Sequence, residues 1–119
     1  MSPEQARGEQ VDIRSDQFSI GLVLYEMLTG IAAFDRGSAV STLAAIVNED
    51  CPPITSASPI PRPLAWIVER CLMKDRSCRY ASTFDLYYDL KLLRDRLNDL
   101  SPAPTPQARK STRLAPLVI

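Results

Sequence analysis

Hydrophobic positions are most concentrated between Asp16 and Thr29, where the sequence reads DQFSIGLVLYEMLT. The apolar side chains of this stretch are spread around nearly the whole circumference of a helix, which is typical of a helix inside a protein. Ser15 or Asp16 suits the N-cap because its side-chain oxygen can accept hydrogen bonds from free backbone amides, and Gly30 suits a left-handed C-terminal cap. The pattern therefore predicts a buried helix over residues 16–29.

Two further helices are predicted by apolar residues that recur three and four positions apart. The first runs from Ser38, its N-cap, to Glu49. Its narrow stripe favours a surface position and consists of Val40, Leu43, Ala44 and Val47. Pro63 opens the second helix at its first position, where the missing amide costs nothing. A wide stripe that is expected to face the core follows, formed by Leu64, Ile67, Val68, Cys71 and Leu72.

A fourth helix is predicted to start at S-T-F-D, Ser82 to Asp85, which resembles a capping box. Its apolar seam consists of Leu86, Leu90, Leu93, Leu97 and Leu100. Residues 1–15 are polar and predict a surface loop with one helical turn, and four prolines between residues 51 and 62 predict another loop. No strand pattern appears, so the predicted fold class is all-α, with four main helices and long loops.

The chain is predicted to divide near Ser101 into a compact unit, residues 1–100, and a Pro-rich basic tail, residues 101–119. The tail has three basic and no acidic residues and few bulky apolar ones, so burial cannot offset the entropy of ordering it. We expect an extended linker. The six mostly apolar residues that end it, LAPLVI, are too few to cross a bilayer.

Composition excludes several functional classes. The 119 residues contain no histidine, which removes the usual general base near neutral pH and the commonest metal ligand. Three cysteines without C-x-x-C spacing argue against a disulfide framework or a metal cage and favour a reducing, cytoplasmic location. Basic and acidic residues balance at 14 each over the whole chain, but residues 1–100 hold 11 basic and 14 acidic residues, a net charge of −3. This negative charge argues against nucleic-acid binding. No apolar run is long enough for a membrane span.

Three short motifs gain meaning from their order along the chain. S-P-E occupies Ser2–Glu4, D-x-F-x-x-G occupies Asp16–Gly21, and L-x-K-D-x-x-x-R-Y occupies Leu72–Tyr80. In this order and spacing they resemble the C-terminal half of a protein kinase domain, most closely that of the bacterial Ser/Thr kinases. The resemblance covers residues 1–98 and implies the lower part of the kinase large lobe, an incomplete domain.

The first and last motifs imply a contact across the chain. Ser2-Pro3-Glu4 looks like the family's A-P-E motif, with Ser in place of Ala. Arg79 matches the arginine that in this family pairs with the glutamate of A-P-E, which is Glu4 here. Arg76 stands where the family usually has proline, so we expect the local turn to differ.

The middle motif implies a structural role for the helix over 16–29. Asp16, Phe18 and Gly21 match the family's D-x-W-x-x-G, with Phe in place of Trp. The resemblance implies that Asp16 holds the backbone of the catalytic loop and that this helix is the hydrophobic pillar of the large lobe. Both the catalytic loop and the helix before it are absent from this chain, so we expect an exposed apolar patch and self-association in isolation.

Phosphoryl transfer in this family requires groups that the sequence lacks. Five groups bind ATP and Mg²⁺ or position the acceptor: a Gly-rich loop, a strand lysine with its glutamate, an Asp and an Asn of the catalytic loop, and a D-F-G aspartate. The sequence contains no G-x-G, H-R-D or D-F-G. We therefore predict no catalytic, cofactor-binding or metal-binding residues, and no activity for the chain alone, although ATP and Mg²⁺ serve the parent family.

Two hypotheses for the function remain open. In the first, the chain is a piece of a Ser/Thr kinase and its partner is the missing portion that carries the ATP site. In the second, it is a non-catalytic helical module that binds a protein partner through the surface around the helix over 38–49. An in-frame upstream H-R-D and D-F-G would favour the first hypothesis.

Overall fold

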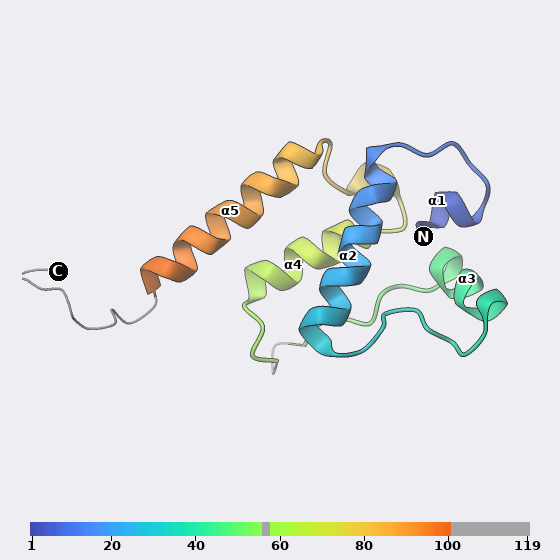
Figure 1. Ribbon diagram of the computed structural model, residues 1–119, viewed down its shortest axis with the longest axis horizontal. Helices are drawn as coiled ribbons and strands as arrows, with labels where there is room; N and C mark the ends of the chain where they lie inside the picture. The colour runs from blue at the N-terminus through green and yellow to red at the C-terminus, as the bar shows by residue number, and fades with distance from the viewer. Residues whose placement is uncertain (56–57, 101–119) are drawn as a thin grey trace, which may run out of the picture.

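The computed structural model describes residues 1–55 and 58–100, and in these ranges the chain is helical without a strand (Figure 1). This confirms the predicted all-α class with four main helices. The predicted boundary at Ser101 and the tail 101–119 lie outside the described residues. The elements in chain order are α1 (Pro3–Ala6), α2 (Ile13–Thr29), α3 (Ala39–Asn48), α4 (Arg62–Cys71), the 3₁₀ turn η1 (Arg76–Cys78) and α5 (Thr83–Leu100).

The start of α2 corrects the prediction. The helix begins at Ile13, and its N-cap is Asp12, whose side chain accepts a hydrogen bond from the Arg14 amide at 2.8 Å. Neither Ser15 nor Asp16 caps it, because both already lie within the first helical turns. At the other end the prediction is confirmed, since Gly30 has a φ of 76° and its amide donates to the carbonyl of Glu26.

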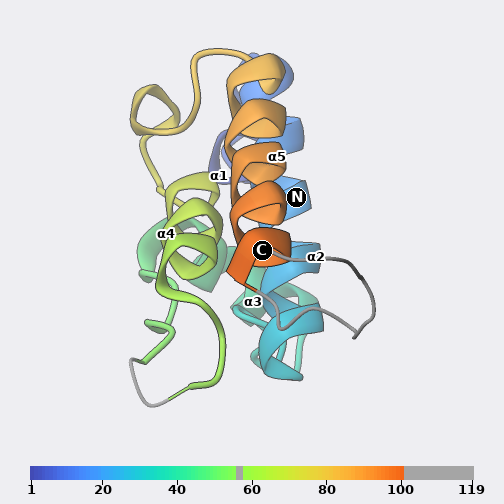
Figure 2. The same cartoon turned by 90° about the vertical axis from the view of Figure 1, so that its left-hand side faces the viewer.

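Helix α2 lies at the centre of the molecule and packs against α4 and α5 (Figures 1 and 2). Its buried face includes Phe18, Gly21 and Tyr25. A Cβ added at Gly21 would lie 2.9 Å from Cβ of Cys71, so glycine is what allows α2 and α4 to approach this closely. The opposite face of α2 is exposed, so the prediction of a buried helix holds for one side only.

Helix α3 has the predicted cap but the wrong predicted face. The hydroxyl of Ser38 accepts from the Ser41 amide at 3.1 Å. Its buried residues are Ala45 and Ile46, whereas Val40 in the predicted stripe is 80% exposed. The reason is tertiary: α3 lies beside α1 at the edge of the molecule (Figure 1), and Ala45 and Ile46 are the residues that pack into the core cluster around Phe18.

Helices α4 and α5 largely confirm the predicted stripes. Helix α4 begins one residue before Pro63 and buries four residues of its core side, Ala65, Ile67, Val68 and Cys71. In α5 the predicted seam is buried only at its start, because the eighteen-residue helix extends past the ten-residue α4. Leu86 is buried and Leu97 is 38% exposed, while the side chain of Leu100 lies outside the described part.

The segment before α2 is more than the predicted surface loop. Pro3 and Glu4 of α1 are buried, as are Ser2 before it and Ser15 in α2. The acidic side chain is inside because the fold provides it with partners, described below. None of the helices described combines the length and the apolar character that crossing a membrane would require.

Candidate functional site

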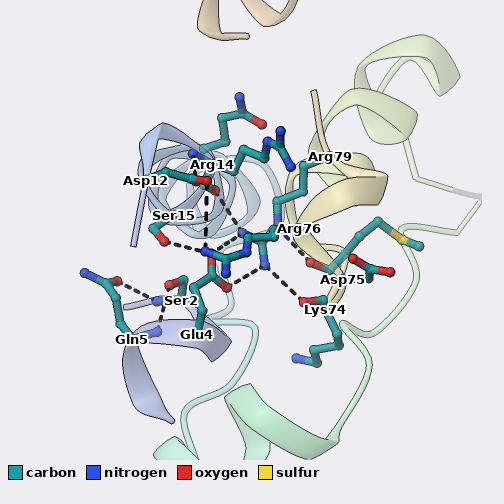
Figure 3. A network of polar contacts seen from close by, with 12 residues as sticks. Ser2, Glu4, Gln5, Asp12, Arg14, Ser15, Lys74, Asp75, Arg76 and Arg79 are labelled. Atoms are coloured by element: carbon teal, nitrogen blue, oxygen red, sulfur yellow. Dashed lines mark hydrogen bonds and ion pairs between the residues drawn. The ribbon is translucent and has the colours of Figure 1, made fainter. Parts of the chain in front are cut away.

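A buried ion pair joins α1 to the segment between η1 and α5 (Figure 3). Glu4 belongs to α1, and Arg79 follows η1, 75 residues further along the chain. Their contact is bidentate: Nη1 of Arg79 lies 2.7 Å from one carboxylate oxygen, and Nη2 lies 3.0 Å from the other. The two side chains are 2% and 0% exposed. The structure thus brings together the two residues that the motifs predicted to pair.

Every donor of the Arg79 guanidinium has an acceptor. Beside the two bonds to Glu4, its N–H groups donate to three backbone carbonyls, those of Met73 at 2.8 Å, Arg14 at 2.9 Å and Lys74 at 3.2 Å. A guanidinium has five N–H donors in a fixed plane, and all five are used here. One side chain therefore fixes α1, the start of α2 and the segment after α4 relative to one another.

The Glu4 carboxylate remains ionised despite its burial. Burial by itself would raise its pKa, but hydrogen bonds from Arg79 and Ser15, with the charge of Arg79, outweigh that effect and lower the pKa to about 2. The Ser15 hydroxyl donates to Oε2 at 2.7 Å. Ser15 was expected to cap α2, and the structure instead assigns its hydroxyl to this carboxylate.

The S-P-E motif forms a helical turn that presents Glu4 to Arg79. The Ser2 hydroxyl accepts from the Gln5 amide at 3.2 Å, and the Ser2 amide donates to Oε1 of Gln5 at 2.8 Å. This is a complete capping box, with Pro3 at the first helical position. Serine in place of the family's alanine therefore supplies the cap of α1.

The aromatic residue of D-x-F-x-x-G, Phe18, packs against the arginine of the ion pair. Phe18 is fully buried, and its ring centre lies 5.0 Å from Cζ of Arg79. It stacks on Phe34 with ring centres 6.1 Å apart. Asp16 of the same motif is exposed and has no hydrogen bond or ion pair within residues 1–55 and 58–100.

A second cation, Lys74, packs on the same aromatic pair. Its Nζ lies 3.9 Å from the ring centre of Phe34 and 5.6 Å from that of Phe18. Burial lowers the pKa of Lys74 to about 8, although the charges of Asp50 and Glu49 oppose the shift. The aromatic faces thus stabilise two cations that have left bulk water.

Two polar contacts near the pair were not predicted from the sequence. Gln17 is fully buried, and its amide donates to the Tyr80 carbonyl and accepts from the Tyr80 amide, both at 3.0 Å. No local signal singles out Gln17, because it follows Arg14, Ser15 and Asp16 in a polar stretch at the start of α2. Arg76, which replaces the family's proline, donates to the Gln10 carbonyl at 2.6 Å and so holds the loop before α2.

The contacts of this arrangement link separate segments of the chain. Each charge at its centre is matched by an opposite charge, a hydrogen bond or an aromatic face. No three metal-ligating side chains lie together in the part of the chain that the structure describes. The cluster of Glu4, Arg79, Ser15, Phe18 and Gln17, called the ion-pair centre below, therefore acts by holding chain segments in place.

Comparison of sequences identifies relatives among bacterial kinases. The chain is 36% identical to the serine/threonine-protein kinase pkn3 of Myxococcus xanthus, an alignment that covers 98% of the chain and 22% of the relative. It is 45% identical to a probable serine/threonine-protein kinase PknB of Bifidobacterium longum over 76% of the chain and 13% of that protein. The chain thus spans less than a quarter of these relatives. No protein-family model matches it.

Comparison of folds finds kinase regions of similar structure. The twitchin kinase region of C. elegans superposes with a TM-score of 0.65 and 24% identity, over 88% of this chain and 17% of that one. A second twitchin kinase fragment gives a TM-score of 0.61 with 21% identity over 88% of the chain. At this level of identity the likeness concerns the fold alone.

Proposed function

We propose that the chain is a scaffold segment of a bacterial-type Ser/Thr protein kinase domain. Its sequence and fold correspond to the C-terminal part of the large lobe of such a domain. The parent reaction would be transfer of the ATP γ-phosphate to a protein Ser or Thr. In this proposal the chain supplies the scaffold, and the portion that binds nucleotide and metal comes from elsewhere.

The observation that carries the proposal is the uncovered face of α2. Ile13, Ile20, Val23 and Met27 are 48%, 39%, 59% and 73% exposed. Their spacing places them on one side of the helix, together with the unpartnered carboxylate of Asp16. We call these five residues the α2 face. A row of apolar residues with one acid near its N-terminal end suits a segment that offers apolar side chains and a few hydrogen-bond donors.

The inactivity of the isolated chain is part of the proposal. Phosphoryl transfer depends on positioned phosphate and metal ligands, because stabilisation of the developing charge supplies most of the catalysis. The sequence lacks the motifs that provide them. The acid and the cation of the ion-pair centre, Glu4 and Arg79, are already committed to one another and are not available to ATP or Mg²⁺.

Reconstitution tests the proposal. The 119-residue chain would be co-expressed with the part of Myxococcus xanthus pkn3 that precedes the matched segment. We expect a complex of the two, and transfer of radiolabel from ATP to a protein substrate only when both are present. Label transferred by the purified chain alone would contradict its inactivity, and absence of a complex would contradict the scaffold role.

The non-catalytic interaction module is supported by one separate observation. Val40 and Leu43 of α3 are 80% and 38% exposed, so α3 also presents apolar side chains to solvent. Two results together would favour this function instead. The chain would fail to bind the pkn3 portion, and Val40→Lys would abolish its binding to a defined protein partner.

A further inference from the structure

A groove of about 310 Å³ lies between α4 and α5, and no residue of the ion-pair centre or of the α2 face lines it. The two helices lie side by side in both views of the molecule (Figures 1 and 2). Much of its lining is apolar and comes from Trp66, Ile67, Leu92 and Leu93. Trp66 is 60% exposed, so a large aromatic surface stands open to a ligand. The volume is at the lower end of the range typical of binding pockets.

The acid that lines this groove has a hydrogen-bond partner, whereas the two arginines that line it have no oxygen acceptor in the described ranges. Its one acid, Asp89, accepts a hydrogen bond from the Tyr80 hydroxyl at 2.8 Å. Its two cations are Arg70 and Arg96. The Arg70 guanidinium lies 4.1 Å from the ring centre of Tyr80, and neither arginine has a carboxylate or carbonyl partner within the described ranges.

Most other arginines of the described chain do have such partners. Arg7, Arg36, Arg76, Arg79 and Arg94 each pair with a carboxylate, and Arg62 donates to the Ile54 carbonyl. Arg14 is the other exception. Two of the three arginines without a polar partner therefore line the same apolar groove. A guanidinium next to apolar surface is well suited to pair with a carboxylate, because its planar donors match the two oxygens.

We propose that the α4–α5 groove binds a short acidic peptide segment of a partner protein. Bulky apolar side chains of the segment occupy the floor beside Trp66, and its Glu or Asp side chains pair with Arg70 and Arg96. Charge complementarity selects this occupant. The chain's own tail, residues 101–119, carries basic and no acidic residues and would be repelled by the two arginines.

Trp66 is the only tryptophan of the chain, so its fluorescence reports directly on this groove. The 119-residue chain would be titrated with a peptide of about ten residues in which Leu and Phe alternate with Glu. A second peptide would carry Lys at every Glu position. We expect the acidic peptide to bind saturably, with a blue shift of the Trp66 emission and a matching heat of binding in calorimetry, and the basic peptide to give neither.

Charge reversal within the groove supplies the matched comparison. We expect Arg96→Glu to weaken binding of the acidic peptide at least about tenfold, because it replaces a charge-assisted hydrogen bond with repulsion. Arg96 has no polar partner in the described structure, so replacing it breaks no hydrogen bond or ion pair of the folded state. Arg94→Glu is the control: Arg94 is on the same helix and exposed but does not line the groove. We expect the Arg94→Glu variant to bind the acidic peptide with unchanged affinity.

Several results would overturn the proposal. Absence of binding, equal binding of both peptides, or undiminished affinity of Arg96→Glu would remove its basis. Tighter binding of a single-stranded oligothymidylate would identify a nucleic-acid site instead. A Trp66 emission that shifts when residues 101–119 are deleted would assign the groove to the tail, and one that shifts on dilution without peptide would assign it to a second copy.

Discussion

The ion-pair centre and the α2 face lie on the same central helix and have opposite character. At the ion-pair centre, charged side chains are 2% exposed or less. On the α2 face, Val23 and Met27 are more than half exposed. Globular proteins ordinarily bury apolar groups and expose charges, so both regions depart from the usual rule, in opposite directions.

The difference lies in where the partners come from. The charge of Arg79 is tolerated inside because the chain itself supplies an acceptor for each of its five donors. The apolar side chains of the α2 face are between 39% and 73% exposed, so the described structure covers them only in part. The ion-pair centre is satisfied by contacts within the chain, whereas the α2 face presents apolar side chains to solvent in the described structure.

Removing one side of the ion pair is expected to have the largest effect. Arg79→Ala leaves the Glu4 carboxylate buried without its charge partner and should lower the free energy of unfolding by about 3–5 kcal/mol. Denaturant titration followed by circular dichroism measures the loss. The control is Arg94→Ala, whose side chain is 66% exposed and whose removal should cost less than about 0.5 kcal/mol. Equal losses in both variants would refute the structural role of the pair.

A double-mutant cycle sharpens this test. Glu4→Gln removes the charge but keeps the shape of its side chain. If the two residues act as one unit, the loss in Glu4→Gln combined with Arg79→Ala should fall well short of the sum of the single losses. Additive losses would mean that each residue stabilises the fold through other contacts.

Low pH is expected to have the next largest effect on the ion-pair centre. The pKa of Glu4 falls from 4.5 in a free chain to about 2 in the folded state, so the unfolded chain binds the proton more tightly. The contribution of the lowered Glu4 pKa to the free energy of unfolding is complete above pH 4.5 and is lost as the pH falls towards 2. The advantage of the natural chain over Glu4→Gln in unfolding free energy should therefore shrink by about 3 kcal/mol across this window. A constant difference would contradict the lowered pKa.

The smallest effect on stability is expected at the α2 face. Val23→Lys with Met27→Lys should change the free energy of unfolding by less than about 0.5 kcal/mol, because both side chains are already exposed. The same change should convert a self-associating chain to a monomer in sedimentation velocity, since it places two charges on the apolar patch.

Val40→Lys is the matched control for this variant, because Val40 is 80% exposed on a different helix. It should leave self-association in place. Dissociation by Val40→Lys alone would show that chains associate through α3 rather than through the α2 face.

Much of the fold followed from local patterns in the sequence. Ser38 and Gly30 were predicted to cap their helices, and the stripe of α4 was predicted to face the core; the structure confirms all three. Capping and helical periodicity involve residues within about four positions of one another, so the local sequence contains the information. The predicted pairing of Glu4 with Arg79, in contrast, came from family motifs.

The sequence by itself determined the helices, their order and the motif residues of the ion-pair centre. Only the tertiary structure decided which face of α3 is covered, that Ser15 donates to Glu4 instead of capping α2, and that α2 is covered on one side. The physical reason is distance along the chain. The Glu4–Arg79 and Gln17–Tyr80 contacts span 75 and 63 residues, and such contacts form only where packing brings separate helices together.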